Sequence, residues 1–415
     1  MSSSPAQIVT REPSSDHSLY EPARRPMRVF VFLAHGFGAR GWTARWTRGE
    51  IPGLNEKLPY GYYHAANGNC FVEYSEDAGE NRLTEFARRS LRRLLGFDLI
   101  HAWRNRKALF AVDVVWAHTE LEHLAVLALW QFRRRPRRPR IIAQSVWLFD
   151  RWHQLHSPKR WLYRRLMTQA DVLAAQSPEN LEAARALFPQ ARHELIGFAV
   201  NLDSMVPPVQ HAVRSPVRIA ALGNDMHRDW ETLITAAGNW SGCRLRIASR
   251  RPIPKRLAKR AANVEVMAAN STAAVAELYS WADLVVVPLK PNLHASGITV
   301  ICEAILRGVP VISTDTGGLR AYFSGDELRY VPPRDPAAMR RALEELADDD
   351  ELRCAIARRA QARILSADFS SRAYAMRHYE LSQQLLADRL APALDAGLSD
   401  PTPEPAWQPS SQTTP

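Results

Sequence analysis

The chain has 415 residues, of which 46% are apolar and 23% are charged, so it is too long for one compact core and too apolar for disorder, and at least two domains are expected. Its net charge of +11 lies mostly in residues 1–200, which contain 29 Lys and Arg against 19 Asp and Glu and therefore indicate an anionic partner. The four cysteines lie far apart without CxxC spacing, which argues against a disulfide scaffold or a zinc module and favours a reducing cytoplasm.

Short β-branched runs alternate with helical segments along most of the chain. In the first half we predict strands at residues 27–34, 113–117, 140–146, 171–177 and 193–200. In the second half we predict strands at 217–223, 244–249, 264–268, 283–289 and 310–314. Near-continuous apolar strands separated by helices indicate parallel sheets covered on both faces, so we expect an α/β protein with two doubly wound, Rossmann-like domains.

The remaining segments are connections and tails. Residues 1–26 and 397–415 are rich in Ser, Pro and charge and are expected to be disordered, because they cannot bury enough apolar surface to fold. Residues 201–216 contain three prolines and no periodic pattern, which predicts a linker. The expected domains are therefore 27–200 and 217–375, and a final helix at 376–396 is expected to return to the N-terminal domain.

A glycine-rich sequence, AHGFGARGW, follows the first predicted strand. In an open parallel sheet, ligands bind at the carboxyl ends of the strands. Gly36 and Gly38 would let the backbone approach a ligand closely, and Arg40 could contact a phosphate, although a flexible turn is the plainer alternative. HGFG is also similar to the oxyanion loop of esterases, but the GxSxG elbow that an α/β-hydrolase requires is missing.

Two segments of the second half have the residues of a nucleotide site. Gly223 lies at a strand end, and Arg228 in the next loop would reach the mouth between the domains. A later helix begins with Ser296, Gly297, Ile298 and Thr299. Its unpaired N–H groups and positive dipole end could hold a diphosphate. Glu303 lies about one turn further, where a carboxylate can accept hydrogen bonds from ribose hydroxyls.

These segments carry a family resemblance. SGITVICEAILRGVPVISTDTGG, residues 296–318, resembles the donor-binding motif of GT-B glycosyltransferases, in particular the retaining family 4 (group 1). GNDMHRDWETL, residues 223–233, resembles the phosphate loop of that family. The resemblance implies the GT-B fold, with two Rossmann-like domains facing a central cleft, and transfer of a sugar from a UDP- or GDP-sugar with retention. We expect no metal, because there is no DxD-like carboxylate pair at a strand end and the helix N-terminus with Arg228 can neutralise the leaving diphosphate. We expect no cofactor.

The same resemblance implies roles for individual residues. Gly223 and Arg228 would contact the donor diphosphate, residues 296–299 would cap it, and Glu303 would bind the ribose. In the first half, DVVWAHTE is similar to a family strand that ends in a histidine, so His118 would lie beside the reacting sugar. The loop from Gly36 to Gly38 would face the acceptor.

Two departures from the family pattern concern the donor site. Members often have a second glutamate eight residues before the ribose glutamate, and this chain has Ala295 there, which leaves the sugar open. The usual phosphate-binding lysine is Arg228, which can bind a phosphate through two N–H groups, and Asn224 replaces the usual arginine. A nucleotide-sugar epimerase of the same fold and a non-catalytic GT-B partner subunit are the alternatives.

The sequence VWLFDRWHQL, residues 146–155, follows a strand of the N-terminal domain. Trp147 and Trp152 could line an acceptor cleft, because flat apolar rings suit sugar faces. Asp150 could act as a general base if the reaction inverts the anomeric carbon. A buried aromatic core segment is the alternative.

Residues 84–97 predict a basic amphipathic helix. Phe86 and Leu94 share one face, and Arg88, Arg89, Arg92 and Arg93 are expected opposite it. This composition is typical of a helix in a membrane interface, although a helix packed on the core also fits. We expect no nucleic-acid partner. The expected protein is a cytoplasmic glycosyltransferase, peripheral on the inner face of the cytoplasmic membrane, with a saccharide or lipid-linked acceptor in exopolysaccharide or glycolipid synthesis.

Overall fold

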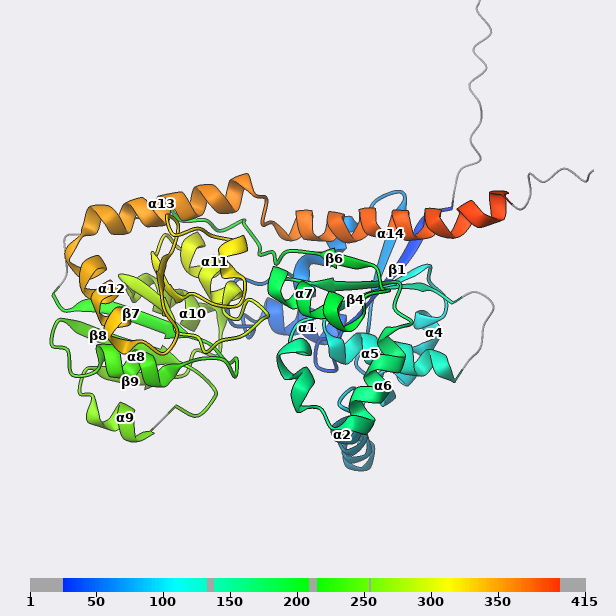
Figure 1. Cartoon of the computed structure of the whole chain (residues 1–415), viewed down its shortest axis with the longest axis horizontal. Coiled ribbons are helices and arrows are strands. Elements are labelled where there is room, and N and C mark those ends of the chain that lie inside the picture. Colours follow the sequence, from blue (N-terminus) through cyan, green and yellow to red (C-terminus); the bar gives the residue numbers. More distant parts are fainter. Residues whose placement is uncertain (1–24, 133–137, 209–214, 254, 396–415) are drawn as a thin grey trace, which may run out of the picture.

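The computed structural model describes residues 25–132, 138–208, 215–253 and 255–395, which form two α/β domains side by side along the long axis (Figure 1). The expected N-terminal tail lies outside these residues except for Arg25 and Pro26, and the expected C-terminal tail lies outside them entirely. Part of the expected linker, residues 209–214, also lies outside them.

The sheet of the N-terminal domain contains six parallel strands in the order β2-β1-β3-β4-β5-β6. The strands are β1 Met27–Phe32, β2 Cys70–Tyr74, β3 Val114–Ala117, β4 Arg140–Ser145, β5 Val172–Ala175 and β6 His193–Leu195. β2 was not predicted, because this edge strand alternates exposed and half-buried residues beyond Cys70 and so lacks a continuous apolar run. In register, Val29 of β1 lies opposite Val72 of β2 and Val114 of β3.

Helices cover both faces of this sheet. They are α1 Ala39–Thr47, η1 Pro59–Ala65, α2 Arg82–Leu95, α3 Leu99–Arg104, α4 Arg106–Leu109, α5 Glu120–Gln131, η2 Phe149–Gln154, α6 Ser157–Met167 and α7 Pro178–Leu187. α5 is almost completely buried, and Thr119 and Glu122 form a capping box that fixes its first turn directly after β3. The carboxyl end of β3 is thereby held in place.

The sheet of the C-terminal domain also contains six parallel strands, in the order β12-β11-β10-β7-β8-β9. The strands are β7 Val217–Leu222, β8 Cys243–Ala248, β9 Val264–Met267, β10 Leu284–Val287, β11 Val311–Thr314 and β12 Arg329–Val331. The helices are α8 Trp230–Ala237, α9 Lys255–Arg260, α10 Thr272–Trp281, α11 Ile298–Leu306, η3 Leu319–Ala321, α12 Pro336–Asp348 and α13 Asp350–Ser366. The strand order reverses between β7 and β10, which is where open α/β sheets bind ligands.

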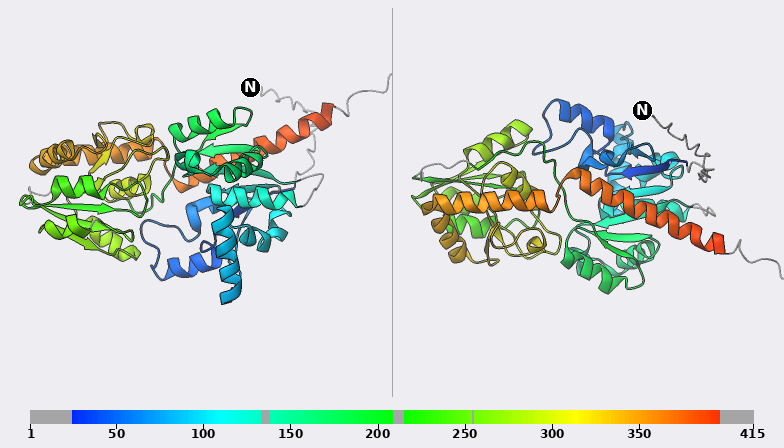
Figure 2. Two further views of the ribbon diagram at one scale, coloured as in Figure 1. Left: turned by 60° about the horizontal axis from the view of Figure 1, so that its bottom comes forward. Right: turned by 90° about the horizontal axis from the view of Figure 1, so that it is seen from above.

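The last helix crosses from one domain to the other. α13 lies along the C-terminal domain, and α14, Ser371–Asp395, lies along the N-terminal domain (Figures 1 and 2). The predicted return is therefore present, with a helix that begins at Ser371 rather than at residue 376. Trp116 of β3 donates its indole N–H to Ser382 Oγ of α14 at 2.8 Å. Among the described residues, no helix combines the length and the apolar character needed to cross a membrane.

Candidate active site

The predicted donor residues meet where β7 and β10 end. Gly223 follows β7, and Ser296 and Gly297 form the turn that leads into α11. The side chain of Arg228 joins the two segments. Its Nε donates to the carbonyl of Leu222 at 3.0 Å, and its Nη1 donates to Ser296 Oγ at 3.2 Å. Segments about 70 residues apart in the sequence are thus held together by one cation.

Two glycines make this close approach possible. Gly223 has a φ of +149°, and a Cβ at this position would lie 2.0 Å from Nε of Arg228. Gly297, the N-cap of α11, has a φ of +86°. Ile298, the first residue of α11, is buried, whereas Thr299 is exposed at the positive end of the helix. The N–H groups of Ser296 and Ile298 already donate, to Asn292 Oδ1 and to the Ala295 carbonyl, both at 3.2 Å. The N–H groups of Gly297 and Thr299 are therefore the ones that this turn can present to an anion.

Arg228 is only 6% exposed, and burial lowers its pKa to about 10, so it keeps its charge at neutral pH. A cavity of about 330 Å³ opens beside it, and Arg251 and Lys290 also line this cavity, together with three acidic residues. The formal charge of this lining is therefore balanced, and residues 296–299 are not part of it.

Glu303 is buried on α11 and contacts both domains. Its Oε1 accepts the backbone N–H of Leu54, from the N-terminal domain, at 2.8 Å, and its Oε2 accepts the hydroxyl of Tyr279 on α10 at 3.0 Å. Burial raises the pKa of the Glu303 carboxyl. A carboxylate has about four acceptor positions, so both oxygens retain capacity for ligand hydroxyls.

Residues 49–54 of the N-terminal domain, which we call the docking segment, lie against the C-terminal domain beside Glu303. Thr272, the first residue of α10, donates its N–H to the Gly49 carbonyl at 3.0 Å and its hydroxyl to the Ile51 carbonyl at 2.6 Å. Gly53 has a φ of +92°, and a Cβ there would lie 2.1 Å from Oε1 of Glu303. The contact between the docking segment and Glu303 therefore requires glycine at position 53.

His118 follows β3 and is buried among aromatic rings. The Tyr62 hydroxyl lies 2.9 Å from Nδ1 of His118, and the ring of Tyr60 stacks on the imidazole with centroids 3.6 Å apart. Tyr374 of α14 completes this group, with its hydroxyl 3.0 Å from that of Tyr62. Burial lowers the pKa of His118 to about 3, so the imidazole is neutral at physiological pH. It can hold hydrogen bonds but has no proton to deliver as an imidazolium acid.

The predicted acceptor loop is organised by an internal carboxylate. The N–H groups of Gly36 and Gly38 each donate to Asp77, which follows β2, at 3.0 Å. Arg40 is exposed, and its Nε lies 3.4 Å from Glu76 Oε1. Asp77 was not predicted as a site residue, because the edge strand before it was not predicted either.

Asp150 and Trp147 reach across to the C-terminal domain. Asp150 Oδ1 accepts the N–H of Leu293 at 2.7 Å, and its Oδ2 lies 2.5 Å from Nδ1 of His294. The indole N–H of Trp147 donates to Asp225 Oδ2 at 3.4 Å. Both side chains, which were predicted to face an acceptor, thus contact the donor-side loops.

Trp152 is 7% exposed and packs edge to face on Phe188 in the core, which agrees with the alternative of a buried aromatic segment. One prediction about exposed side chains is wrong. Arg88 does not share the wet face of its helix with the other arginines. It is buried, because it forms ion pairs with Glu80 and Asp98, both at 2.8 Å.

Asp225, His227 and His294 have the side-chain types of a metal site, with their ligand atoms within 4.8 Å of one another. Their hydrogen bonds, however, require a protonated imidazole, because His294 has a carboxylate on each ring nitrogen. Burial alone would lower the pKa of His294, but the hydrogen bonds to Asp150 and Asp225 outweigh it and raise the pKa to about 9. The group therefore fits a charged hydrogen-bond network rather than a set of metal ligands.

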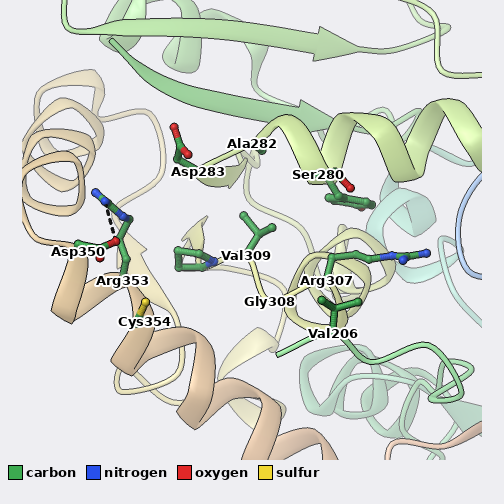
Figure 3. A pocket seen from close by; sticks show the side chains of 12 residues that line it. Val206, Ser280, Ala282, Asp283, Arg307, Gly308, Val309, Asp350, Arg353 and Cys354 are labelled. Atoms are coloured by element: carbon green, nitrogen blue, oxygen red, sulfur yellow. Dashed lines mark hydrogen bonds and ion pairs between the residues drawn. The ribbon is translucent and has the colours of Figure 1, made fainter. Parts of the chain in front are cut away.

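A second cavity, of about 210 Å³, lies at the opposite edge of the C-terminal sheet, where β10 and β11 begin. Figure 3 shows Asp350 and Arg353 of α13 on one side, joined by an ion pair of 3.0 Å, and Arg307 and Val206 on the other. Arg307 follows the C-terminal end of α11, whereas the turn with Ser296 and Gly297 lies at the N-terminal end of this helix. We assign this cavity no part in the donor site.

Two facing α/β domains, with a cationic turn at the switch point of the second, form the GT-B architecture. Residues 221–349 match the family model described as Glycosyl transferases group 1. The C-terminal domain is thus similar to the group 1 glycosyl transferases. No curated protein matches the chain at a significant level.

Solved structures share the whole architecture. Sucrose-phosphate synthase from Thermosynechococcus elongatus is 18% identical with a TM-score of 0.65, over 87% of this chain and 100% of that one. Alr3699/HepE from Anabaena, in complex with UDP and glucose, is 15% identical with a TM-score of 0.59, over 85% and 98%. An α,α-trehalose-phosphate synthase from Burkholderia xenovorans is 12% identical with a TM-score of 0.59, over 87% and 99%. These likenesses confirm the predicted fold.

The sequence analysis missed several residues that contact the site. Two of these residues could have been predicted from their positions: His294 lies two residues before Ser296, and Asp225 lies between Gly223 and Arg228. Leu54 contributes only its backbone N–H, so its side chain gave no signal at all.

Proposed function

We propose that the protein transfers a sugar from a UDP- or GDP-sugar to a saccharide acceptor without a metal ion. The observation that carries the proposal is Arg228, whose buried guanidinium joins the loop after β7 to the turn before α11. Together with the N–H groups at the start of α11, this cation would neutralise the diphosphate as it leaves. The Anabaena neighbour, solved with UDP-glucose, supports a donor of this class.

We also propose retention of the anomeric configuration. The bond from the sugar carbon to the diphosphate oxygen breaks, the acceptor oxygen bonds to that carbon on the same face, and the leaving phosphate takes the acceptor proton. This route needs no protein base. It is supported by Asp150, whose two oxygens are both engaged, and by His118, whose neutral ring is suited to holding a sugar or acceptor hydroxyl.

The test is release of UDP or GDP from UDP-glucose and GDP-mannose by the purified protein, with and without saccharide acceptors and in the presence of a chelator. We expect release that requires an acceptor, survives the chelator and is lost in Arg228→Ala. Conversion to an epimeric donor without an acceptor would instead identify an epimerase. Donor binding without any conversion would identify a non-catalytic subunit.

The outer face of α2 supports a lipid-linked acceptor. This helix projects from the N-terminal domain (Figure 2, left). Its apolar residues point outward, with Leu83 80% exposed and Phe86 and Leu94 each 72% exposed. Arg89 and Arg93 are exposed on the same helix. A helix with exposed leucines and arginines suits an anionic bilayer surface, where each basic residue contributes about 1 kcal/mol.

This part of the proposal is tested by sedimentation with vesicles. The protein should sediment with phosphatidylglycerol vesicles but not with phosphatidylcholine vesicles, and salt should release it. Arg89→Glu with Arg93→Glu should abolish sedimentation. Arg341→Glu with Arg358→Glu, at exposed positions of the C-terminal domain, makes the same change in net charge and should not. If the wild type ignores anionic vesicles at low salt, a phosphorylated soluble acceptor replaces the lipid-linked one.

A further inference from the structure

Three charged side chains form a bridge between the two domains. Asp150, on η2 of the N-terminal domain, lies 2.5 Å from Nδ1 of His294, and Asp225, after β7 of the C-terminal domain, lies 3.0 Å from Nε2 of the same ring. An ionised carboxylate can accept hydrogen bonds but cannot donate them, so both ring nitrogens of His294 must donate. His294 is therefore an imidazolium, and at 4% exposure it is shielded from water.

The bridge lies at the ends of both loops that form the proposed diphosphate site. His294 comes two residues before Ser296, which accepts from Arg228, and Asp225 lies between Gly223 and Arg228 in the other loop. Two further hydrogen bonds join the N-terminal domain to the loop that contains Leu293 and His294. Asp150 accepts the N–H of Leu293, and the hydroxyl of Ser177 donates to the carbonyl of the same residue.

Between His294 and Ser296, the backbone adopts an unfavourable conformation. Ala295 has a φ of +50°, in the left-handed region, where a residue with a Cβ persists only if its surroundings hold it. The Ala295 carbonyl accepts the N–H of Ile298, and the N–H of Ser296 donates to Asn292 Oδ1, both at 3.2 Å. The side chains on either side add to this hold: the bridge fixes His294, and Arg228 donates to Ser296.

We propose that His294 is a positioning residue of the donor site: the imidazolium between Asp150 and Asp225 holds the domains closed and, through Ala295, sets the shape of the turn that receives the diphosphate. The titratable groups that face His294 are the two carboxylates and His227, whose ring packs edge to face on His294 with centroids 4.9 Å apart. Nδ1 of His227 also lies 3.1 Å from Oδ1 of Asp225, and Arg228 lies behind Asp225. Without the imidazolium, two carboxylates would face each other in a buried space, which favours separation of the domains.

The proposal predicts different effects for domain closure and nucleotide binding. Asp150→Asn keeps the shape and can still accept from Leu293, but it loses the charge that attracts His294 across the interface. His294→Gln removes the cation itself. Both variants should lower kcat/KM for the donor about tenfold or more, the effect of one lost charge-assisted hydrogen bond. The affinity for free UDP should also fall, because the bridge shapes the turn that receives the diphosphate, but by less than kcat/KM, because UDP binding does not need the closed domains.

Asp171→Asn is the matched control. Asp171 is also a buried carboxylate of the N-terminal domain, paired with Arg138 and Arg140, but it lies at the amino end of β5, away from the interface. This variant should lower the unfolding temperature without changing kcat/KM. Small-angle X-ray scattering with UDP bound should give a larger radius of gyration for Asp150→Asn than for the wild type, and an unchanged one for Asp171→Asn.

The measurement of kcat/KM rests on the proposed function, whereas the measurement of the radius of gyration does not. If the wild type shows no turnover but Asp150→Asn is more open, the proposed function fails and the bridge stands. If Asp150→Asn is as compact as the wild type and keeps its kcat/KM, the bridge has no positioning role. A stoichiometric transition metal in the purified protein that is lost in His294→Gln would also overturn the inference, because a metal-bound imidazole cannot donate from both nitrogens.

Discussion

Replacing Glu303 by glutamine separates its role in nucleotide binding from its role in stability. In Glu303→Gln, the amide oxygen can still accept the N–H of Leu54, and the amide NH₂ can donate to the Tyr279 hydroxyl oxygen, which accepts as well as donates. Both internal contacts therefore survive, and the free energy of unfolding should change little. The side chain loses one of its two acceptor oxygens, so it can accept fewer hydrogen bonds from ribose hydroxyls.

The expected loss in nucleotide affinity is about 1–3 kcal/mol, the cost of one unmet polar partner, or roughly five- to 150-fold in Kd. Isothermal titration with UDP or GDP measures it directly. Inorganic pyrophosphate, which has no ribose, should bind the wild type and Glu303→Gln equally. Nucleotides that lack the 2′ or 3′ hydroxyl should bind the two proteins with a smaller difference than the parent nucleotide does.

Unchanged affinity for both UDP and GDP in a folded Glu303→Gln variant would refute the assignment of Glu303 to the ribose. Tyr279→Phe is the control for indirect effects. It removes the donor to Oε2 but keeps the carboxylate, so it should weaken nucleotide binding less than Glu303→Gln does.

Three further predictions follow from the same contacts. Arg228→Lys should lower kcat at least tenfold in steady-state assays but should leave the affinity for the nucleoside unchanged. The reason is that an ammonium group cannot bridge the two loops as the guanidinium does. An unchanged kcat would show that Arg228 does not belong to the phosphate site. Gly53→Ala should lower the unfolding temperature, since a positive φ costs about 1–3 kcal/mol, whereas Gly41→Ala, in α1 with open space around it, should leave it equal or higher. Because the folded-state pKa of His294 is raised from 6.5 to about 9, its stabilisation is complete below pH 6.5 and is lost as the pH rises through 9; urea unfolding should show this loss in the wild type but not in His294→Gln.

The sequence predicted the eight central strands and two of the four edge strands, β6 and β9, but missed the other two edge strands. The ten predicted runs correspond to ten strands, and most of these are central strands, where burial on both faces favours apolar residues along the strand. β2 has polar or exposed residues at alternate positions, and β12 has only three residues, so neither forms such a run. Both are edge strands.

The site could be predicted only where its residues share one local motif. Gly223 and Arg228, and the turn and helix up to Glu303, follow single strands, so their spacing is visible in the sequence. The contacts between the domains depend on how two separate folds meet, and no local pattern encodes them. The docking segment reaches Glu303 through backbone atoms, and Tyr60 covers His118 from a turn in which its own φ is +61°.

The position of α14 affects the order in which the protein can fold during synthesis. The core on one face of the N-terminal sheet includes Tyr374, Ala375, Leu381 and Leu385, which are among the last described residues of the chain. During synthesis, residues 27–200 leave the ribosome long before this helix does. That face of the N-terminal sheet therefore stays uncovered until the whole C-terminal domain has been synthesised. An N-terminal domain produced by itself would have to carry residues 371–395 as an attached segment to bury Trp116 and its neighbours.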